Sequence, residues 1–240
     1  PLTNAVDEDD LVAEFTGSIR TAAELAGRWG IRLRMLDLGG GFGCPYAVPG
    51  ERPHYHRLRD ALEAALARYL PGWRDEMRIA FESGRYLVGD SGRLLCTVMD
   101  VKKSRENHYA VLDSGVNHLG GLSGIGRLLP LTAHPVSKSD SGDSPPKPIS
   151  LVGPLCTPAD VVSRSTPLPE PRPGQHLVIP NVGAYGVTAS LIGFLSRPAP
   201  IEVLVRRGAV ASASRLELAR KRFGTTQQNT VVEPREEPEG

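Results

Sequence analysis

The sequence has little of several features that would define its class at once. It has no apolar run near the roughly 20 residues of a membrane span, and its start, "PLTNAVDEDD", has no basic or apolar signal segment. Its three cysteines (Cys44, Cys96 and Cys156) are odd in number and form no CxxC, which argues against a disulfide framework and structural zinc. The 28 basic and 27 acidic residues nearly cancel, so nothing favours nucleic acid or an anionic membrane as a partner. We therefore expect a reduced, cytoplasmic protein.

Residues 1–89 alternate helical and strand patterns. Between Asp7 and Gly30, apolar residues recur at helical spacing, with acidic residues at the start and a glycine past the end. "IRLRMLDL" then indicates a buried strand, "YHRLRDALEAALARYLPGW" a helix that Pro71 ends, and "MRIAF" a further strand. This order is typical of α/β folds with parallel strands.

The helical period disappears after about Gly89. Short β-like runs separated by Gly, Pro, Ser and Asn predict an all-β sandwich or barrel over residues 90–219. The runs are "RLLCTVMDVKK", "HYAVLDSG", "PISLVGP", "ADVVSRSTP", "QHLVIPN" and "IEVLVRRG". Residues 136–148 are expected to form a polar loop, and residues 220–240, poor in apolar side chains, a disordered tail.

Two segments are candidates for a ligand site. "LDLGGGFGCPY" (36–46) places glycines directly after a buried strand, at the edge where α/β folds bind ligands and where backbone amides can hold a phosphate. A tight strand-to-helix turn would need the same glycines, whereas the GxGxxG spacing of dinucleotide-binding proteins is absent. "ESGR" (82–85) ends the next strand. Glu82 and Arg85 would suit a ligand with a cationic ring nitrogen and an anionic group, or would form a surface ion pair.

Five segments, in this order and spacing, make the chain resemble the fold-type III pyridoxal-phosphate decarboxylases, the ornithine/diaminopimelate/arginine decarboxylase family. They are "LDLGGGFGCPY", "FESGRYLVGDSGRLLCTVMDVK", "YAVLDSGVNH", "LVGPLCTPADVV" and "IPNVGAYGVTAS". The resemblance implies an α/β plus all-β protein: the last strands of a (β/α)8 barrel like that of alanine racemase, then a β-sandwich or β-barrel domain. It looks closest to the branch that acts on aminoacyl groups of carrier proteins in antibiotic biosynthesis.

The resemblance also implies which residues bind pyridoxal 5'-phosphate. The glycine segment matches the loop whose amides hold the phosphate, and Glu82 matches the acid that pairs with the pyridinium nitrogen and so keeps the ring an electron acceptor. Gly84 and Arg85 match positions that contact phosphate or carboxylate, although Ser83 stands where the family usually has proline. The matching residues are Gly39, Gly40, Gly41, Glu82, Gly84, Arg85 and Tyr185, the last through a hydrogen bond to the phosphate.

On the substrate side, Cys156 matches the cysteine that reprotonates the decarboxylated carbon, delivered across a homodimer interface from the partner's β domain. The next residue is commonly an acid that binds a distal ammonium, but here it is the neutral Thr157. Ornithine and diaminopimelate are therefore unexpected substrates, and a carrier-bound aminoacyl group or another amino acid is expected. Arg127 matches a carboxylate-binding arginine. Asp113 and Asn117 match site positions or simply shape a turn.

The family's Schiff-base lysine and its ring-stacking histidine have no counterpart here. All five lysines lie outside the matching motifs: Lys102, Lys103, Lys138, Lys147 and Lys221. We therefore expect the C-terminal portion of a decarboxylase, with an incomplete barrel and an exposed apolar flank. A racemase of the same fold type and a non-catalytic homologue that binds partners are the alternatives.

Overall fold

The computed structural model describes residues 4–120, 133–137, 145–221 and 223. The chain forms two compact units, Pro1–Pro200 and Ile201–Gly240.

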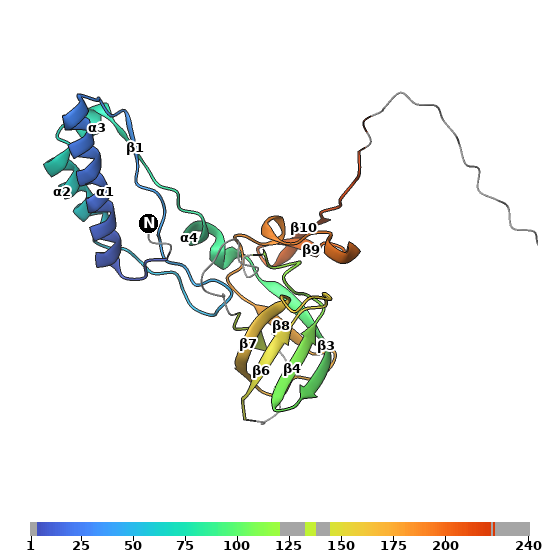
Figure 1. Ribbon diagram of the computed structural model, residues 1–240. Helices are drawn as coiled ribbons and strands as arrows, with labels where there is room; N and C mark the ends of the chain where they lie inside the picture. The colour runs from blue at the N-terminus through green and yellow to red at the C-terminus, as the bar shows by residue number, and fades with distance from the viewer. Residues whose placement is uncertain (1–3, 121–132, 138–144, 222, 224–240) are drawn as a thin grey trace, which may run out of the picture. The chain divides into compact units, whose positions relative to one another are not determined.

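The first unit begins with the predicted alternation of helices and strands (Figure 1). The elements are α1 (Glu8–Trp29), β1 (Met35–Asp37), α2 (Leu58–Tyr69), α3 (Trp73–Glu76), β2 (Arg78–Ala80) and α4 (Arg85–Val88). At the start of α1 the Asp7 carboxylate accepts a hydrogen bond from the Asp9 N–H (2.7 Å), and at its end Gly30 adopts a left-handed conformation with φ 62°. Both predicted helices are confirmed, and α2 ends before Pro71.

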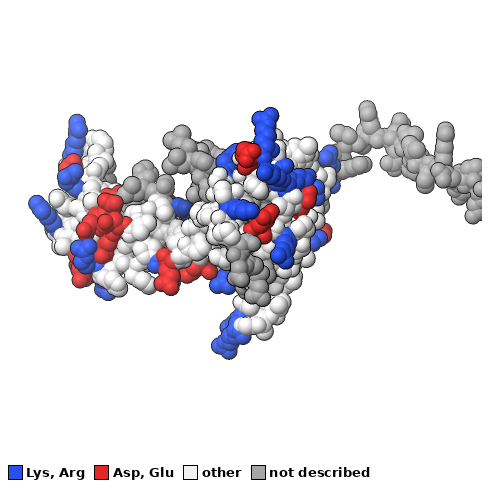
Figure 2. All heavy atoms as spheres, turned by 90° about the horizontal axis from the view of Figure 1, so that it is seen from below, with Lys and Arg blue, Asp and Glu red and all other residues white. Residues whose placement is uncertain are grey.

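Helices α1 and α2 pack against each other through apolar faces. The buried cluster that they form with neighbouring segments contains Ala5, Leu11, Phe15, Ile19, Leu38, Leu58, Leu62, Ala65 and Leu66. The Glu8 carboxylate of α1 accepts hydrogen bonds from the N–H groups of Arg57 (2.6 Å) and Leu58 (2.9 Å), which supplies the N-terminal cap that α2 lacks from its own sequence. Acidic and basic side chains lie interspersed over the helical part of this unit (Figure 2).

Strands β1 and β2 are parallel neighbours, with Met35 opposite Arg78 and Asp37 opposite Ala80. Each strand has three residues and is shorter than the predicted run. Their parallel pairing means that both strands end at the same edge, which is the arrangement that the sequence predicted for the two candidate segments.

The rest of this unit is built on a curled, six-stranded mixed sheet in the order β5-β8-β3-β4-β6-β7 (Figure 1). The strands are β3 (Leu94–Ser104), β4 (Asn107–Leu112), β5 (Val136–Ser137), β6 (Lys147–Val152), β7 (Val161–Leu168) and β8 (His176–Ile179). β4 and β6 are parallel, and all other neighbours are antiparallel. Short 3-10 turns follow at η1 (Gly89–Ser91), η3 (Val187–Ala189) and η4 (Phe194–Ser196).

The expected polar loop at 136–148 needs correction at both ends. Val136 and Ser137 form β5, which pairs with β8, and Lys147 already begins β6. The alternation of apolar residues was too short at these ends to indicate a strand, and the pairing depends on a strand some 40 residues away in sequence.

The second unit contains the hairpin of β9 (Ile201–Arg206) and β10 (Ala209–Arg215), joined at Arg207 and Gly208, which have φ 52° and 79°. The run at 201–208 is confirmed as a strand. Its partner β10 was not predicted, because alanine and serine dominate it. Most of the expected tail at 220–240 lies outside the described residues.

Candidate active site

The glycine segment and the "ESGR" segment leave the parallel pair side by side. Beyond the strands, the Leu38 N–H donates to the Ala80 carbonyl (3.0 Å), and the Glu82 N–H donates to the Gly39 carbonyl (2.7 Å). The structure therefore brings these two sequence-predicted segments together at the carboxyl ends of β1 and β2.

Each of the three consecutive glycines is required by the chain's own geometry. Gly39 and Gly41 adopt left-handed conformations, with φ 78° and 97°. A Cβ atom on Gly40 would lie 2.9 Å from the Glu82 carbonyl oxygen, closer than real Cβ contacts allow. The Asp37 carboxylate further fixes the turn by accepting the Gly39 N–H (2.8 Å). The tight-turn interpretation is therefore sufficient to explain the glycines, whether or not an anion binds.

The same turn leaves donors for an anion. Within the described part of the chain, the N–H groups of Gly40 and Gly41 have no acceptor, whereas the Gly41 carbonyl accepts from the Ala5 N–H (2.7 Å). Two adjacent, half-buried amides at the end of a parallel strand are suited to phosphate oxygens. The residues present thus fit the phosphate of pyridoxal phosphate.

Tyr185, from the segment after β8, reaches the same edge. Its hydroxyl oxygen lies 3.9 Å from the position that a Cβ atom on Gly84 would occupy, and Arg85 follows directly as the first residue of α4. Tyr185 has φ 53°, which is rare for an aromatic residue. The buried Tyr46 supports it: the Tyr46 hydroxyl donates to the Tyr185 carbonyl (3.2 Å), and the two rings pack edge to face.

The segment that carries Tyr185 is held tightly against the turn η1. The Gly183 N–H donates to the Gly89 carbonyl (2.9 Å), and the Val182 N–H donates to the Gly92 carbonyl (3.0 Å). A Cβ atom on Gly183 would overlap the Val88 carbonyl and the Ser91 hydroxyl. These contacts link the sheet to the "ESGR" segment and place Tyr185 beside it.

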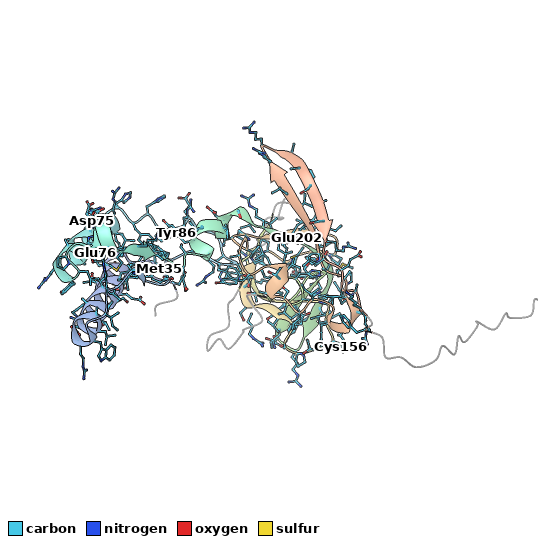
Figure 3. The ribbon with its side chains drawn as sticks, turned by 90° about the horizontal axis from the view of Figure 1, so that it is seen from above. Met35, Asp75, Glu76, Tyr86, Cys156 and Glu202 are labelled. Carbon is cyan, nitrogen blue, oxygen red and sulfur yellow. The ribbon has the colours of Figure 1, made fainter. Side chains whose placement is uncertain are left out.

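Cys156 and Thr157 lie in the loop between β6 and β7. The Thr157 N–H donates to the Leu155 carbonyl (2.8 Å), and the Ala159 N–H donates to the Thr157 hydroxyl (3.3 Å). No contact within the described residues joins this loop to the glycine segment. Figure 3 accordingly shows Cys156 on the sheet, apart from Tyr86 of α4.

Cys156 is the accessible thiol of the three. Burial raises the pKa of the Cys96 thiol to about 12, with the Asp113 carboxylate adding to the effect. Burial also raises the pKa of Cys44, and the Asp90 carboxylate acts in the same direction. Cys44 and Cys96 therefore stay protonated and shielded, whereas Cys156 is exposed.

The remaining predicted residues separate into two groups. Arg127 lies outside the described residues. Asp113 and Asn117 shape turns, because the Asp113 carboxylate accepts the Thr97 N–H (2.9 Å) and the Asn117 side chain accepts the Gly115 N–H (3.2 Å).

A separate apolar groove of about 410 Å³ lies between α2 and β2. Its lining includes Phe42, Leu62, Trp73, Ile79, Phe81 and Tyr86. Phe81 is 42% exposed and Met35 of β1 is 61% exposed. An apolar flank is thus exposed beside the parallel pair, as the sequence predicted. In the described residues, no helix combines the length and apolarity needed to span a membrane.

Comparison with known proteins gives consistent relatives. The family model for the C-terminal sheet domain of pyridoxal-dependent decarboxylases matches residues 11–183. The chain is 29% identical over 215 residues to an L-glutamyl-[BtrI acyl-carrier protein] decarboxylase of Niallia circulans, covering 86% of this chain and 49% of the relative. It is 32% identical over 207 residues to a diaminopimelate decarboxylase of Methanothermobacter thermautotrophicus, covering 82% of this chain and 46% of the relative.

A solved structure shares the fold. The diaminopimelate decarboxylase of Helicobacter pylori, complexed with L-lysine, aligns with a TM-score of 0.66 and 25% identity, over 89% of this chain and 48% of the other. The chain spans about half the length of the curated relatives that it matches. The α/β elements therefore correspond to part of a barrel, followed by the sheet domain, as the sequence predicted. Since the family model covers most of the chain and the motifs occur in the expected order, the chain belongs to the pyridoxal-dependent decarboxylase family.

Proposed function

We propose that this chain supplies the phosphate- and ring-binding residues and the catalytic cysteine of a decarboxylase that acts on an amino acid or a carrier-bound aminoacyl group. The observation that carries the proposal is the convergence of the glycine segment, "ESGR" and Tyr185 at one strand edge. In this proposal residues 1–89 are the cofactor-binding part, and residues 90–219 are the domain that bears Cys156.

The cofactor, when bound, accepts the electron pair that is released as carbon dioxide leaves the substrate. The amides of Gly40 and Gly41 would hold its phosphate together with Arg85 and the Tyr185 hydroxyl, because these donors face one edge and suit an anion. The Glu82 carboxylate, which is exposed at this edge, would keep the ring nitrogen protonated.

Cys156 would return a proton to the substrate carbon. A thiol is a suitable acid because an ordinary cysteine has a pKa of about 8.5 and exchanges its proton near neutral pH. Since no described contact joins its loop to the glycine segment, we propose that two chains pair as a homodimer and that Cys156 of one chain serves the other's site.

Thr157 would select the substrate. A neutral hydroxyl beside the thiol cannot pair with a distal ammonium, and an unpaired buried charge costs roughly several kcal/mol. The carrier-protein glutamyl decarboxylase among the relatives is named for a substrate whose side chain is not an amine. We therefore propose a substrate without a distal ammonium, such as a glutamyl group.

Cofactor titration tests the phosphate site. Binding of pyridoxal phosphate, followed by absorbance or fluorescence, should weaken about tenfold or more in Arg85→Gln and Tyr185→Phe, because each loses a donor to a charged group. Binding of pyridoxal, which has no phosphate, should be equal in all variants. The matched control is Arg59→Gln, an exposed position on α2 that should leave both affinities unchanged. Equal affinity of wild type and Tyr185→Phe for pyridoxal phosphate, with Arg85→Gln also unaffected, would refute this site.

Mixing of variants tests the shared site. In the full-length protein, Cys156→Ala and Glu82→Ala homodimers should be nearly inactive. After subunit exchange, half of the dimers would be mixed and would hold one intact site, so activity should recover to about a quarter of wild type. Subunit exchange without recovered activity would place the cysteine in its own chain's site or outside catalysis.

A further inference from the structure

Asp160, four residues after the cysteine, is a buried carboxylate for which the sequence gave no role. It is only 2% exposed, yet its two oxygens accept separate backbone hydrogen bonds. Oδ1 accepts the Val116 N–H (2.8 Å), and Oδ2 accepts the Leu155 N–H (2.7 Å). Leu155 directly precedes Cys156, whereas Val116 belongs to the "LDSGVNH" turn after β4.

Two glycines make room for this carboxylate. A Cβ atom on Gly115 would overlap Asp160 Oδ1, and a Cβ atom on Gly153 would overlap both of its oxygens. The backbone of Asp160 is also fixed, because its carbonyl accepts the Gly153 N–H (3.0 Å) and its N–H donates to the Thr157 carbonyl (3.1 Å). The carboxylate is thus enclosed by the two turns that it joins.

We infer that Asp160 is a positioning residue that fastens the Cys156 loop to the "LDSGVNH" turn. A carboxylate can accept at both oxygens, and amide hydrogen bonds to a charged group are among the stronger ones in proteins. Cys156 itself is exposed and makes no contact that would fix it. Its position depends on Leu155, which Asp160 holds. The inference that this matters for proton return rests on the proposed function.

This arrangement also explains why both motifs are present. Gly115 and Gly153 are needed because the carboxylate passes close to them, so the glycines of "DSG" and "VGP" belong to one structural unit with the Asp of "PAD". Asparagine at 160 would keep the shape but would turn an N–H₂ group toward one of the two amides. Neither amide could then be satisfied as it is now.

Hydrogen exchange tests the link. In the wild-type chain, the Val116 and Leu155 amides should be protected although both lie outside strands. In Asp160→Asn these two amides should exchange at least about tenfold faster, while the amides of the β3–β4 ladder keep their wild-type rates. The matched control is Asp100→Asn, the same substitution at an exposed site on β3, which should change neither amide.

Several results would overturn the inference. Unprotected Val116 and Leu155 amides in the wild type would do so even if Asp160→Asn fails to fold. Unchanged exchange of both amides in Asp160→Asn would do so too. Equal acceleration of all amides would also overturn it, because it would make Asp160 a general stabilising residue. Failure of the proposed function is distinguishable: full activity of Cys156→Ala would refute the proton donor and leave the exchange result unaffected.

Discussion

Substitution of Gly183 by alanine should break the link between the Tyr185 segment and the turn η1. The new Cβ atom would overlap the Val88 carbonyl and the Ser91 hydroxyl and would lie against the Gly92 amide. Two of these groups belong to the backbone, so a change of side-chain rotamer cannot relieve the overlap.

The size of the effect follows from what must move. Overpacking a tight contact costs about 1–3 kcal/mol. The chain separation would also weaken two backbone hydrogen bonds, from Gly183 to Gly89 and from Val182 to Gly92, each with a net contribution of about 0.5–1.5 kcal/mol. We expect Gly183→Ala to lower the free energy of unfolding by about 2–5 kcal/mol, a large part of the roughly 5–15 kcal/mol of a typical domain.

Urea unfolding of the chain measures this loss, with a lower midpoint and an unchanged slope. The control is Gly17→Ala, the same substitution within α1, where no atom lies within 4 Å of the new Cβ position. It should raise the stability by about 0.5–1 kcal/mol, because alanine favours a helix over glycine. A Gly183→Ala chain within about 0.5 kcal/mol of wild type would refute the reasoning, because the overlap would then be absorbed without cost.

Three further outcomes are expected. Stability should fall as pH rises from about 9 to about 12, by up to roughly 1.4 kcal/mol per pH unit, because folded Cys96 retains its proton up to about 12 whereas the unfolded thiol releases it near 9.0; Cys96→Val should flatten this fall in urea titrations at stepped pH. Iodoacetamide at pH 8 should modify Cys156 first, and Cys44 and Cys96 only in urea, which peptide mass spectrometry would check; early modification of Cys96 would contradict its burial. In the full-length enzyme, Thr157→Glu should shift kcat/KM toward diaminopimelate or ornithine by about tenfold or more, measured as released carbon dioxide, and a wild type that already prefers either amine would contradict the assigned role of Thr157.

Local signals made much of the fold predictable. The start of α1 follows from an aspartate cap and acidic residues, and its end follows from Gly30 in a left-handed conformation. The long β runs are strands because apolar side chains alternate in them, as the buried Cys96 and Val98 do in β3. These patterns depend on neighbours within a few residues, so the chain order is sufficient to find them.

Long-range contacts set what the sequence did not reveal. Asp160 is quoted within a motif, but its buried role depends on the Val116 amide, 44 residues away. Glu8 likewise caps α2 from another helix, 50 residues before Leu58. The pair of glycines around an aspartate in "VGPLCTPAD" was the available signal for Asp160, since a glycine is often retained where another group passes close to the backbone.

The geometry of the glycine segment decides which substitutions can test its chemistry. Gly39 and Gly41 need their left-handed conformations, and Gly40 lies against the Glu82 carbonyl, so alanine at any of the three would distort the strand edge before any ligand binds. Such variants would lose cofactor even if their amides never touched a phosphate. Arg85 and Tyr185 differ, because their side chains can lose a donor while the backbone keeps its path. A selective loss of pyridoxal phosphate over pyridoxal in these two variants therefore distinguishes a phosphate site from a turn that merely requires glycine.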